Sequence, residues 1–232
     1  MKEIRHVGLI LDGTRRWARK NGVPVNSSGI ILIKKMDEIL TWIKDINDDG
    51  YNIKYLSAYA YSIDNLKRDE GFKHQLFDAM DWGINHLIKK YEKDFRIVIG
   101  GTRKKIDKKY MKVLEEVENR TKDNRVIVNI AMCYDGKQEI CDAVEKFLKS
   151  ETVVWDWKNF NPNILGKYLY FDDVPIDLII RTGYEKRLSG FMPWYSTYSE
   201  LFFLDCLSID FTKEMFLDVL EEFFKRDRRF GI

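Results

Sequence analysis

Residues 6–22 read HVGLILDGTRRWARKNG, and this stretch decides how the rest of the chain is interpreted. An apolar run ends at Asp12 and Gly13, and a charged segment begins at Thr14. Apolar residues at consecutive positions are typical of a strand that is buried on both faces, as in a parallel sheet covered by helices. The stretch therefore predicts a buried strand, a tight turn and the start of a helix.

The same alternation continues through the chain. Short apolar runs predict strands over residues 6–11, 54–61, 95–99, 126–133, 176–181 and 201–204. Apolar residues at spacings of three and four predict amphipathic helices within residues 32–46, 76–87, 110–117, 140–147 and 216–224. This order predicts an α/β fold, a mostly parallel six-stranded sheet wrapped by helices with right-handed crossovers. We interpret the irregular segment 151–175 as an excursion before the fifth strand, so residues 1–232 form a single predicted domain.

The composition excludes several classes of protein. Hydrophobic residues make up 45% and charged residues 33%, which is typical of a globular chain. The formal net charge of +2 does not favour a nucleic-acid partner. Three cysteines without C-x-x-C spacing and three scattered histidines predict neither disulfides nor zinc. No window approaches the roughly 20 apolar residues of a membrane span. We expect no integral membrane segment and a cytoplasmic location. The protein would bind peripherally to a membrane if its substrate or product is strongly hydrophobic.

The end of the first strand is a candidate anion and metal site, because ligands of open parallel sheets bind at the carboxyl ends of the strands. A carboxylate at Asp12 suits a hard cation such as Mg²⁺, and Gly13 lets a ligand approach the backbone. A helix start supplies free N–H groups and a positive dipole end that suit phosphate. The cationic side chains that follow are Arg15, Arg16 and Arg19. The alternative is an ordinary strand, turn and helix with surface arginines.

Two other predicted strands also end in polar residues. Residues 177–205 place Arg181 at a strand end, with Arg187 and Ser189 in the turn behind it, and guanidinium groups match phosphate oxygens bidentately. Apolar residues such as Phe191 and Trp194 follow as a candidate wall. The alternative is a turn in which a nearby glutamate pairs with an arginine. A further predicted strand lies within residues 55–70 and is followed by the polar residues Ser62, Asp64, Asn65 and Arg68. Without the other two segments, these residues would be interpreted as a polar connecting loop.

Taken together, five ordered segments resemble the cis-prenyltransferase family, of the undecaprenyl diphosphate synthase type. They read HVGLILDGTRRWA, YAYSIDNLKR, NIAMCYDGK, DLIIRTGYEKRLSGFMPWYSTYSE and RDRRFG, and they span nearly the whole chain. The resemblance implies a hydrophobic tunnel beside the sheet, isoprenoid diphosphate substrates (dimethylallyl or isopentenyl diphosphate), Mg²⁺ and a homodimer.

The resemblance also implies roles for individual residues. Asp12 would bind the metal, assisted by Glu200 of the other subunit. Ser62 and Asn65 would lie near the reacting carbons. The diphosphate groups would be held by Gly13, Thr14, Arg15, Arg16, Arg19, Arg181, Arg187 and Ser189. The apolar wall would be formed by Trp17, Phe191 and Trp194.

The chain also departs from the family pattern. Thr14 and Arg15 replace Asn-Gly, and Val25 and Gly29 replace an arginine and a histidine that serve the allylic diphosphate. These changes resemble the branch of lavandulyl and cyclolavandulyl diphosphate synthases, which join two dimethylallyl units head to middle. Three alternatives stay open: this irregular coupling, which the departures favour, regular cis-condensation with isopentenyl diphosphate, and a non-catalytic subunit. Retention of Asp12 and the arginines disfavours the third.

The sequence does not fix the depth of the tunnel or the group that removes a proton. Phe72, Leu76 and Met80 are either tunnel floor or ordinary core, and core is the default for apolar residues on a helix.

Overall fold

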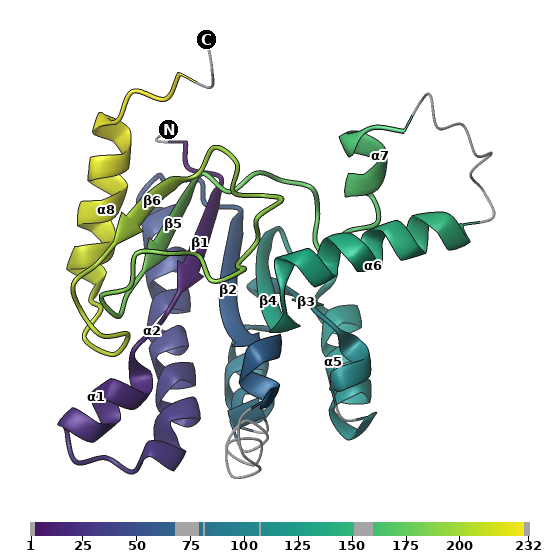
Figure 1. Cartoon of the computed structure of the whole chain (residues 1–232). Coiled ribbons are helices and arrows are strands. Elements are labelled where there is room, and N and C mark those ends of the chain that lie inside the picture. The colour runs from purple at the N-terminus through teal and green to yellow at the C-terminus, as the bar shows by residue number, and fades with distance from the viewer. Residues whose placement is uncertain (1–2, 68–78, 81, 107, 151–159, 230–232) are drawn as a thin grey trace.

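The computed structural model describes residues 3–67, 79–80, 82–106, 108–150 and 160–229. Six strands form one sheet in the order β3-β4-β2-β1-β5-β6, and every neighbouring pair is parallel (Figure 1). The strands are β1 (His6–Ile10), β2 (Tyr55–Ser62), β3 (Phe95–Gly100), β4 (Val126–Tyr134), β5 (Leu178–Arg181) and β6 (Glu200–Phe203). All six lie where the apolar runs predicted them, within two residues at either end, and the α/β prediction is confirmed.

Helices cover both faces of this sheet. The longer ones are α1 (Thr14–Lys20), α2 (Ser28–Asp48), α5 (Lys108–Thr121), α6 (Gly136–Lys149) and α8 (Lys213–Lys225). Shorter helical segments are η1 (Val25–Ser27), η2 (Ile63–Lys67), η3 (Ile84–Ile88), α4 (Lys89–Tyr91), η4 (Arg103–Lys105) and α7 (Pro162–Gly166). The predicted helix within residues 76–87 lies partly outside the described residues. Among the described residues, none of the helices combines the length and the apolar character that crossing a membrane requires.

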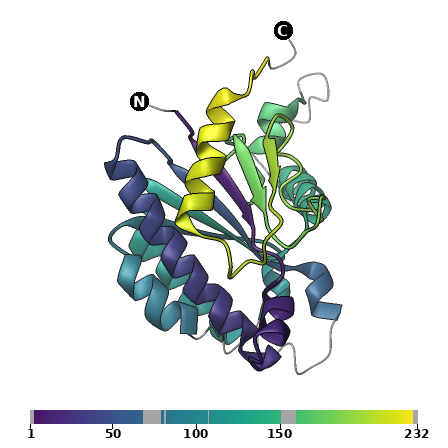
Figure 2. The ribbon, with the colours of Figure 1, turned by 90° about the vertical axis from the view of Figure 1, so that its left-hand side faces the viewer.

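The two faces of the sheet have separate cores because side chains alternate along each strand. Val7 and Leu9 of β1 belong to a core shared with α2, α5 and α8, whereas Ile10 belongs to a second core shared with α6 and α7. Figure 2 shows α2 and α8 crossing the same face of the sheet. Both faces are thus shielded from water, which explains the apolar runs read in the sequence.

The amino edge of the sheet, where the strands begin, is tied together by polar contacts. One carboxylate oxygen of Asp177 accepts from the backbone N–H groups of Arg5 and His6 at 2.8 and 3.0 Å, and the other accepts from Arg228 at 3.0 Å. Arg226 donates to Glu200 at 2.7 Å. These contacts join the first strand, the last two strands and the C-terminal segment.

His6 is the first member of a buried chain of hydrogen bonds that crosses three neighbouring strands of the sheet. Its Nδ1 lies 3.0 Å from the carbonyl of Val174, so this nitrogen carries the proton, and Nε2 accepts from the Ser57 hydroxyl at 2.7 Å. The Ser57 oxygen in turn accepts from the Asn129 amide at 3.1 Å. Burial lowers the pKa of His6 to about 4, because a charged imidazole would lose its water.

Candidate active site

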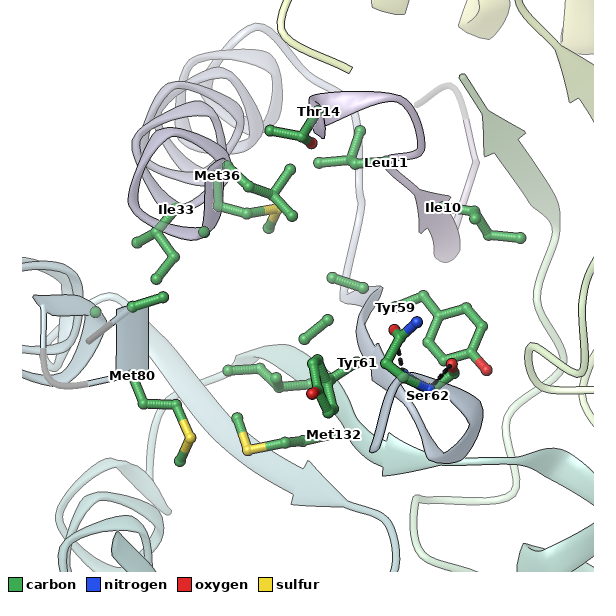
Figure 3. A pocket seen from close by; sticks show the side chains of 18 of the residues that line it. Ile10, Leu11, Thr14, Ile33, Met36, Tyr59, Tyr61, Ser62, Met80 and Met132 are labelled. Atoms are coloured by element: carbon green, nitrogen blue, oxygen red, sulfur yellow. Dashed lines mark hydrogen bonds between the residues drawn. The ribbon is translucent and has the colours of Figure 1, made fainter. Parts of the chain in front are cut away.

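A cavity of about 700 Å³ opens at the carboxyl edge of the sheet, between α2 and the strands. Figure 3 shows Ile33 and Met36 reaching into it from one side, opposite Tyr61, Met80 and Met132. Other apolar residues that line it are Leu32, Leu40, Leu87, Ile88, Tyr91, Ile97, Ile99, Leu114, Val128 and Ile130. The polar residues that line it are Asp12, Thr14, Arg15, Arg16, Ser28, Ser62, Asp64, Asn65, Arg181 and Ser189. The cavity therefore joins a polar mouth to an apolar interior.

Asp12 lies at the mouth, where β1 has ended. Gly13, which follows it, has a φ of 103°, a left-handed conformation that favours glycine, and an added Cβ would lie 2.7 Å from the Leu207 side chain. The two carboxylate oxygens of Asp12 lie 3.3 Å from Arg16 and 3.1 Å from Arg181. A single carboxylate thus faces two guanidinium groups, and the mouth carries a surplus of positive charge.

Arg181 ends β5, and its side chain is only 4% exposed. Besides Asp12, its guanidinium donates to the Ser189 hydroxyl at 2.9 Å and to the backbone carbonyl of Arg187. The chain folds around this group through several left-handed residues, with φ values of 63° at Tyr184 and 51° at Ser189. Such a conformation costs free energy for residues other than glycine, so the contacts with Arg181 must hold the loop in place.

Tyr59 of β2 stabilises this loop. The Tyr59 ring stacks on Phe191 with centroids 5.2 Å apart, and its hydroxyl lies 3.2 and 3.3 Å from the carbonyls of Tyr134 and Ser189. Burial, with a smaller contribution from the charge of Asp135, raises the pKa of Tyr59 to about 12, so the hydroxyl remains a donor. Tyr59 was not singled out from the sequence, because an aromatic residue in a strand does not reveal which loop it contacts.

Ser62 and Asn65 lie across the cavity from Asp12, where β2 passes into η2. The Asn65 amide oxygen accepts from the Ser62 N–H, and the Ser62 hydroxyl accepts from the Asn65 N–H, both at 3.2 Å (Figure 3). The register of β2 against β4 shifts at Tyr59–Tyr61 and again at Tyr61–Ser62. Irregularities of this kind re-aim side chains next to ligand sites, and here the consecutive residues 59–62 all line the cavity.

Several of the predicted site residues lie elsewhere. Arg187 is 62% exposed and pairs with Glu185 at 2.5 Å, as the alternative interpretation of this turn expects. Glu200 lies at the amino edge of the same chain with Arg226, so the structure does not bring it to Asp12. Arg19 is exposed on α1 and does not line the cavity.

The three predicted wall residues do not line the cavity either. The Trp17 indole donates to Asp210 at 2.8 Å, and the Trp194 indole donates to Asp173 at 2.9 Å. Phe191 is fully buried in the core on the other face of the sheet. Met80 does line the cavity, while Phe72 and Leu76 lie outside the described residues.

The mouth suits a magnesium ion that arrives with its ligand. Among the described residues, there is no cluster of three histidine, cysteine, aspartate or glutamate side chains that could form a cage for a metal. Mg²⁺ is commonly held by one or two carboxylates, several waters and substrate phosphates, without a dedicated protein cage. Asp12, whose side chain is 36% exposed, offers such a carboxylate.

Comparisons with known proteins agree with this geometry. A prenyltransferase family model, that of undecaprenyl diphosphate synthase, matches residues 10–231. The tritrans,polycis-undecaprenyl-diphosphate synthase (geranylgeranyl-diphosphate specific) of Pyrococcus abyssi is 35% identical, over 98% of this chain and 86% of that protein. The isoprenyl transferase of Thermotoga maritima is 37% identical, over 100% of this chain and 98% of that protein.

Solved structures show the same fold. The crystal structure of lavandulyl diphosphate synthase from Lavandula x intermedia, in complex with dimethylallyl diphosphate, matches with a TM-score of 0.90. The match covers 99% of this chain and 98% of that chain, at 23% sequence identity. The chain therefore belongs to the undecaprenyl diphosphate synthase family of prenyltransferases, enzymes that act on isoprenoid diphosphates.

Proposed function

We propose that this enzyme is a magnesium-dependent prenyltransferase that condenses isopentenyl diphosphate with an allylic diphosphate in the cis configuration. The cavity carries the proposal, because its polar mouth holds Asp12, Arg16 and Arg181 while its interior is apolar. A diphosphate at the mouth would place its hydrocarbon chain in the interior. The names of the relatives from Pyrococcus abyssi and Thermotoga maritima support this reaction.

The residues at the mouth would act on charge and position. Mg²⁺, held by Asp12 and by Glu200 of a second copy of the chain, would neutralise the departing diphosphate. Arg16 would bind the allylic diphosphate, and Arg181 with Ser189 the second one, since charge-assisted hydrogen bonds to phosphate are short and strong. Ser62 and Asn65 would orient the reacting carbons. The apolar walls would keep water away from the allylic cation.

The size of the cavity supports a short product. Its volume of about 700 Å³ falls within the range of roughly 300–1,000 Å³ that is usual for sites of small molecules. We therefore expect the product to consist of a few C5 units, shorter than the undecaprenyl chain in the names of the relatives.

A second reaction is favoured by one observation. Gly29, which stands where the family has a histidine, lines the cavity, together with the adjacent Ser28. The loss of that imidazole at the allylic position favours irregular head-to-middle coupling of two dimethylallyl units. Under this alternative the same residues bind the same class of substrate, and only the second carbon nucleophile differs.

Product analysis distinguishes the two reactions. The purified enzyme with Mg²⁺ would be given dimethylallyl diphosphate alone and then with isopentenyl diphosphate, as well as geranyl and geranylgeranyl diphosphate as starters. Products that require isopentenyl diphosphate and grow in C5 steps are expected. A branched C10 diphosphate from dimethylallyl diphosphate alone, identified as its alcohol after dephosphorylation, would establish the irregular reaction. A C55 product would contradict the short chain, and no product from any starter would favour a non-catalytic subunit.

A further inference from the structure

The loop between β6 and α8, residues 204–212, packs behind the mouth of the cavity and contacts it at several points. The Leu207 side chain fills the space beside Gly13, and the Cys206 carbonyl accepts from the Gly183 N–H at 2.6 Å. Farther along, Asp210 accepts from the Trp17 indole at 2.8 Å, and the Phe211 carbonyl accepts from Lys35 of α2 at 3.0 Å. One loop thus joins α1, α2 and the turn after β5.

Ser208 is the residue of this loop that contacts the polar mouth most directly. Its backbone N–H donates to the Asp12 carbonyl at 3.0 Å, where the Thr182 hydroxyl also donates at 2.8 Å. Its hydroxyl lies 2.7 Å from the Thr14 hydroxyl. Ser208 is fully buried and Thr14 is 8% exposed, so water does not compete for this contact. Ser208 does not line the cavity, whereas Asp12 and Thr14 both do.

We propose that Ser208 is a positioning residue, which acts on the diphosphate and its metal ion through Asp12 and Thr14. The net contribution of a buried hydroxyl pair to stability is small, and apolar groups of the same shape would serve the fold nearly as well. What such a pair adds is a defined geometry, because a hydrogen bond between two hydroxyls forms only over a narrow range of separations and angles. Here that geometry holds the backbone of residues 12–14 next to Arg181, which ends the neighbouring strand β5. The inference rests on the proposed function.

The test compares two variants that each remove one hydroxyl of the pair, Ser208→Ala and Thr14→Val. Valine has nearly the same shape as threonine but has no hydroxyl. The matched control is Thr121→Val on α5, whose buried hydroxyl donates to the Val117 carbonyl at 2.9 Å. Binding of inorganic pyrophosphate with Mg²⁺ would be measured by calorimetry, kcat and KM by turnover, and folding by thermal melting. We expect Ser208→Ala to weaken pyrophosphate binding and to lower kcat/KM about fivefold, the effect of losing one neutral hydrogen bond that positions Thr14. The control should match the wild type.

The double variant makes the test independent of folding losses. If the two hydroxyls act as one unit, Ser208→Ala with Thr14→Val should be no more than about twofold worse than either single variant. Ser208→Thr, which keeps the hydroxyl, should retain binding. Unchanged pyrophosphate binding and kcat/KM in Ser208→Ala, with or without a lower melting temperature, would overturn the inference alone. A wild-type protein that neither binds pyrophosphate nor forms product would overturn the proposed function as well.

Discussion

The two edges of the sheet use similar charged residues in different ways. At the amino edge, Asp177 pairs with Arg228 and Glu200 with Arg226, so each carboxylate has its own guanidinium. At the carboxyl edge, Asp12 faces both Arg16 and Arg181, beside a cavity that Arg15 also lines. The amino edge closes the fold, whereas the carboxyl edge keeps a positive surplus for an anion. Ligands of open α/β sheets bind outside the carboxyl ends of the strands, which is the edge where this surplus lies.

Removal of the Asp12 carboxylate should give the largest effect. Asp12→Ala deletes the proposed magnesium ligand, and we expect kcat to fall by roughly 10³-fold, the upper range for loss of one preorganised electrostatic group. The melting temperature should also fall by several degrees, because the Arg181 side chain is only 4% exposed and loses its carboxylate partner, so kcat would be measured well below that temperature. The matched control is Asp45→Ala, which breaks a surface pair with Lys213. Full activity of Asp12→Ala would refute the role of the carboxyl edge.

The proposed role of Glu200 would contradict the division between a structural amino edge and an anion-binding carboxyl edge. It gives a residue of the amino edge a catalytic role in a second subunit. If Glu200 acts across a dimer, Asp12→Ala and Glu200→Gln chains should each be nearly inactive alone. After unfolding and refolding as an equal mixture, half of the dimers would be mixed, and each would contain one intact site.

The mixture should then recover about a quarter of the wild-type activity, as two-fold symmetry requires. Activity per milligram would be measured at several protein concentrations, with mixed dimers isolated by two affinity tags. A mixture that stays inactive, although mixed dimers form, would place Glu200 outside the site and leave the two edges with separate tasks.

Arg15 tests how the carboxyl edge binds its anion. Arg15→Gly restores the residue that the family pattern has at this position, and it removes one cation from the mouth. We expect KM for the allylic diphosphate to rise about tenfold, which corresponds to one charge-assisted hydrogen bond. Arg19→Gly, on the exposed side of α1, is the control. If neither KM nor the melting temperature changes, Arg16 and Arg181 are sufficient to bind the allylic diphosphate without Arg15.

His6 should have the smallest effect on catalysis, since it belongs to the amino edge. Its pKa of about 4 in the fold lies below the usual 6.5, so the unfolded chain binds the proton more readily. The stability that depends on neutral His6 is complete above pH 6.5 and decreases as the pH falls towards 4, by roughly 3 kcal/mol in total. Urea unfolding at pH 7, 6, 5 and 4 would measure it.

His6→Gln keeps a donor and an acceptor, and it should remove most of this decrease while kcat at pH 7.5 stays the same. His86→Gln, at an exposed position, is the control. If the free energy of unfolding of His6→Gln decreases by the same amount between pH 6.5 and 4, the acid sensitivity belongs to other groups.

The sheet could be predicted from the sequence because strands buried on both faces leave a continuous apolar signal. The polar mouth was predicted in part, since Asp12 and Arg181 end their strands and polar residues at strand ends are informative. The wall of the cavity was not, because an apolar residue does not reveal its side of the sheet. Phe191 was assigned to the wall and lies in the opposite core, whereas Ile97 and Ile99 line the cavity from within a strand.

Arg187 illustrates a different limit. Its charge suggested a diphosphate site, but a charged side chain can pair with its nearest opposite charge, and Arg187 pairs with Glu185. The register shifts at residues 59–62 were also absent from the sequence signal, because they depend on how β2 pairs with β4. Long-range pairing of this kind is decided by the whole sheet.

The order of the strands also has a consequence for how the enzyme is made. Asp12 and Arg181 are 169 positions apart, and Thr14 and Ser208 are 194 apart, because β1 lies in the middle of the sheet beside β5. Contacts between such distant positions form late, after the entropy of closing a long loop has been overcome. A ribosome-bound chain that has not yet released its loop after β6 would lack the mouth of its cavity. Diphosphate binding would therefore report that synthesis has passed residue 208 and that β1 has paired with β5.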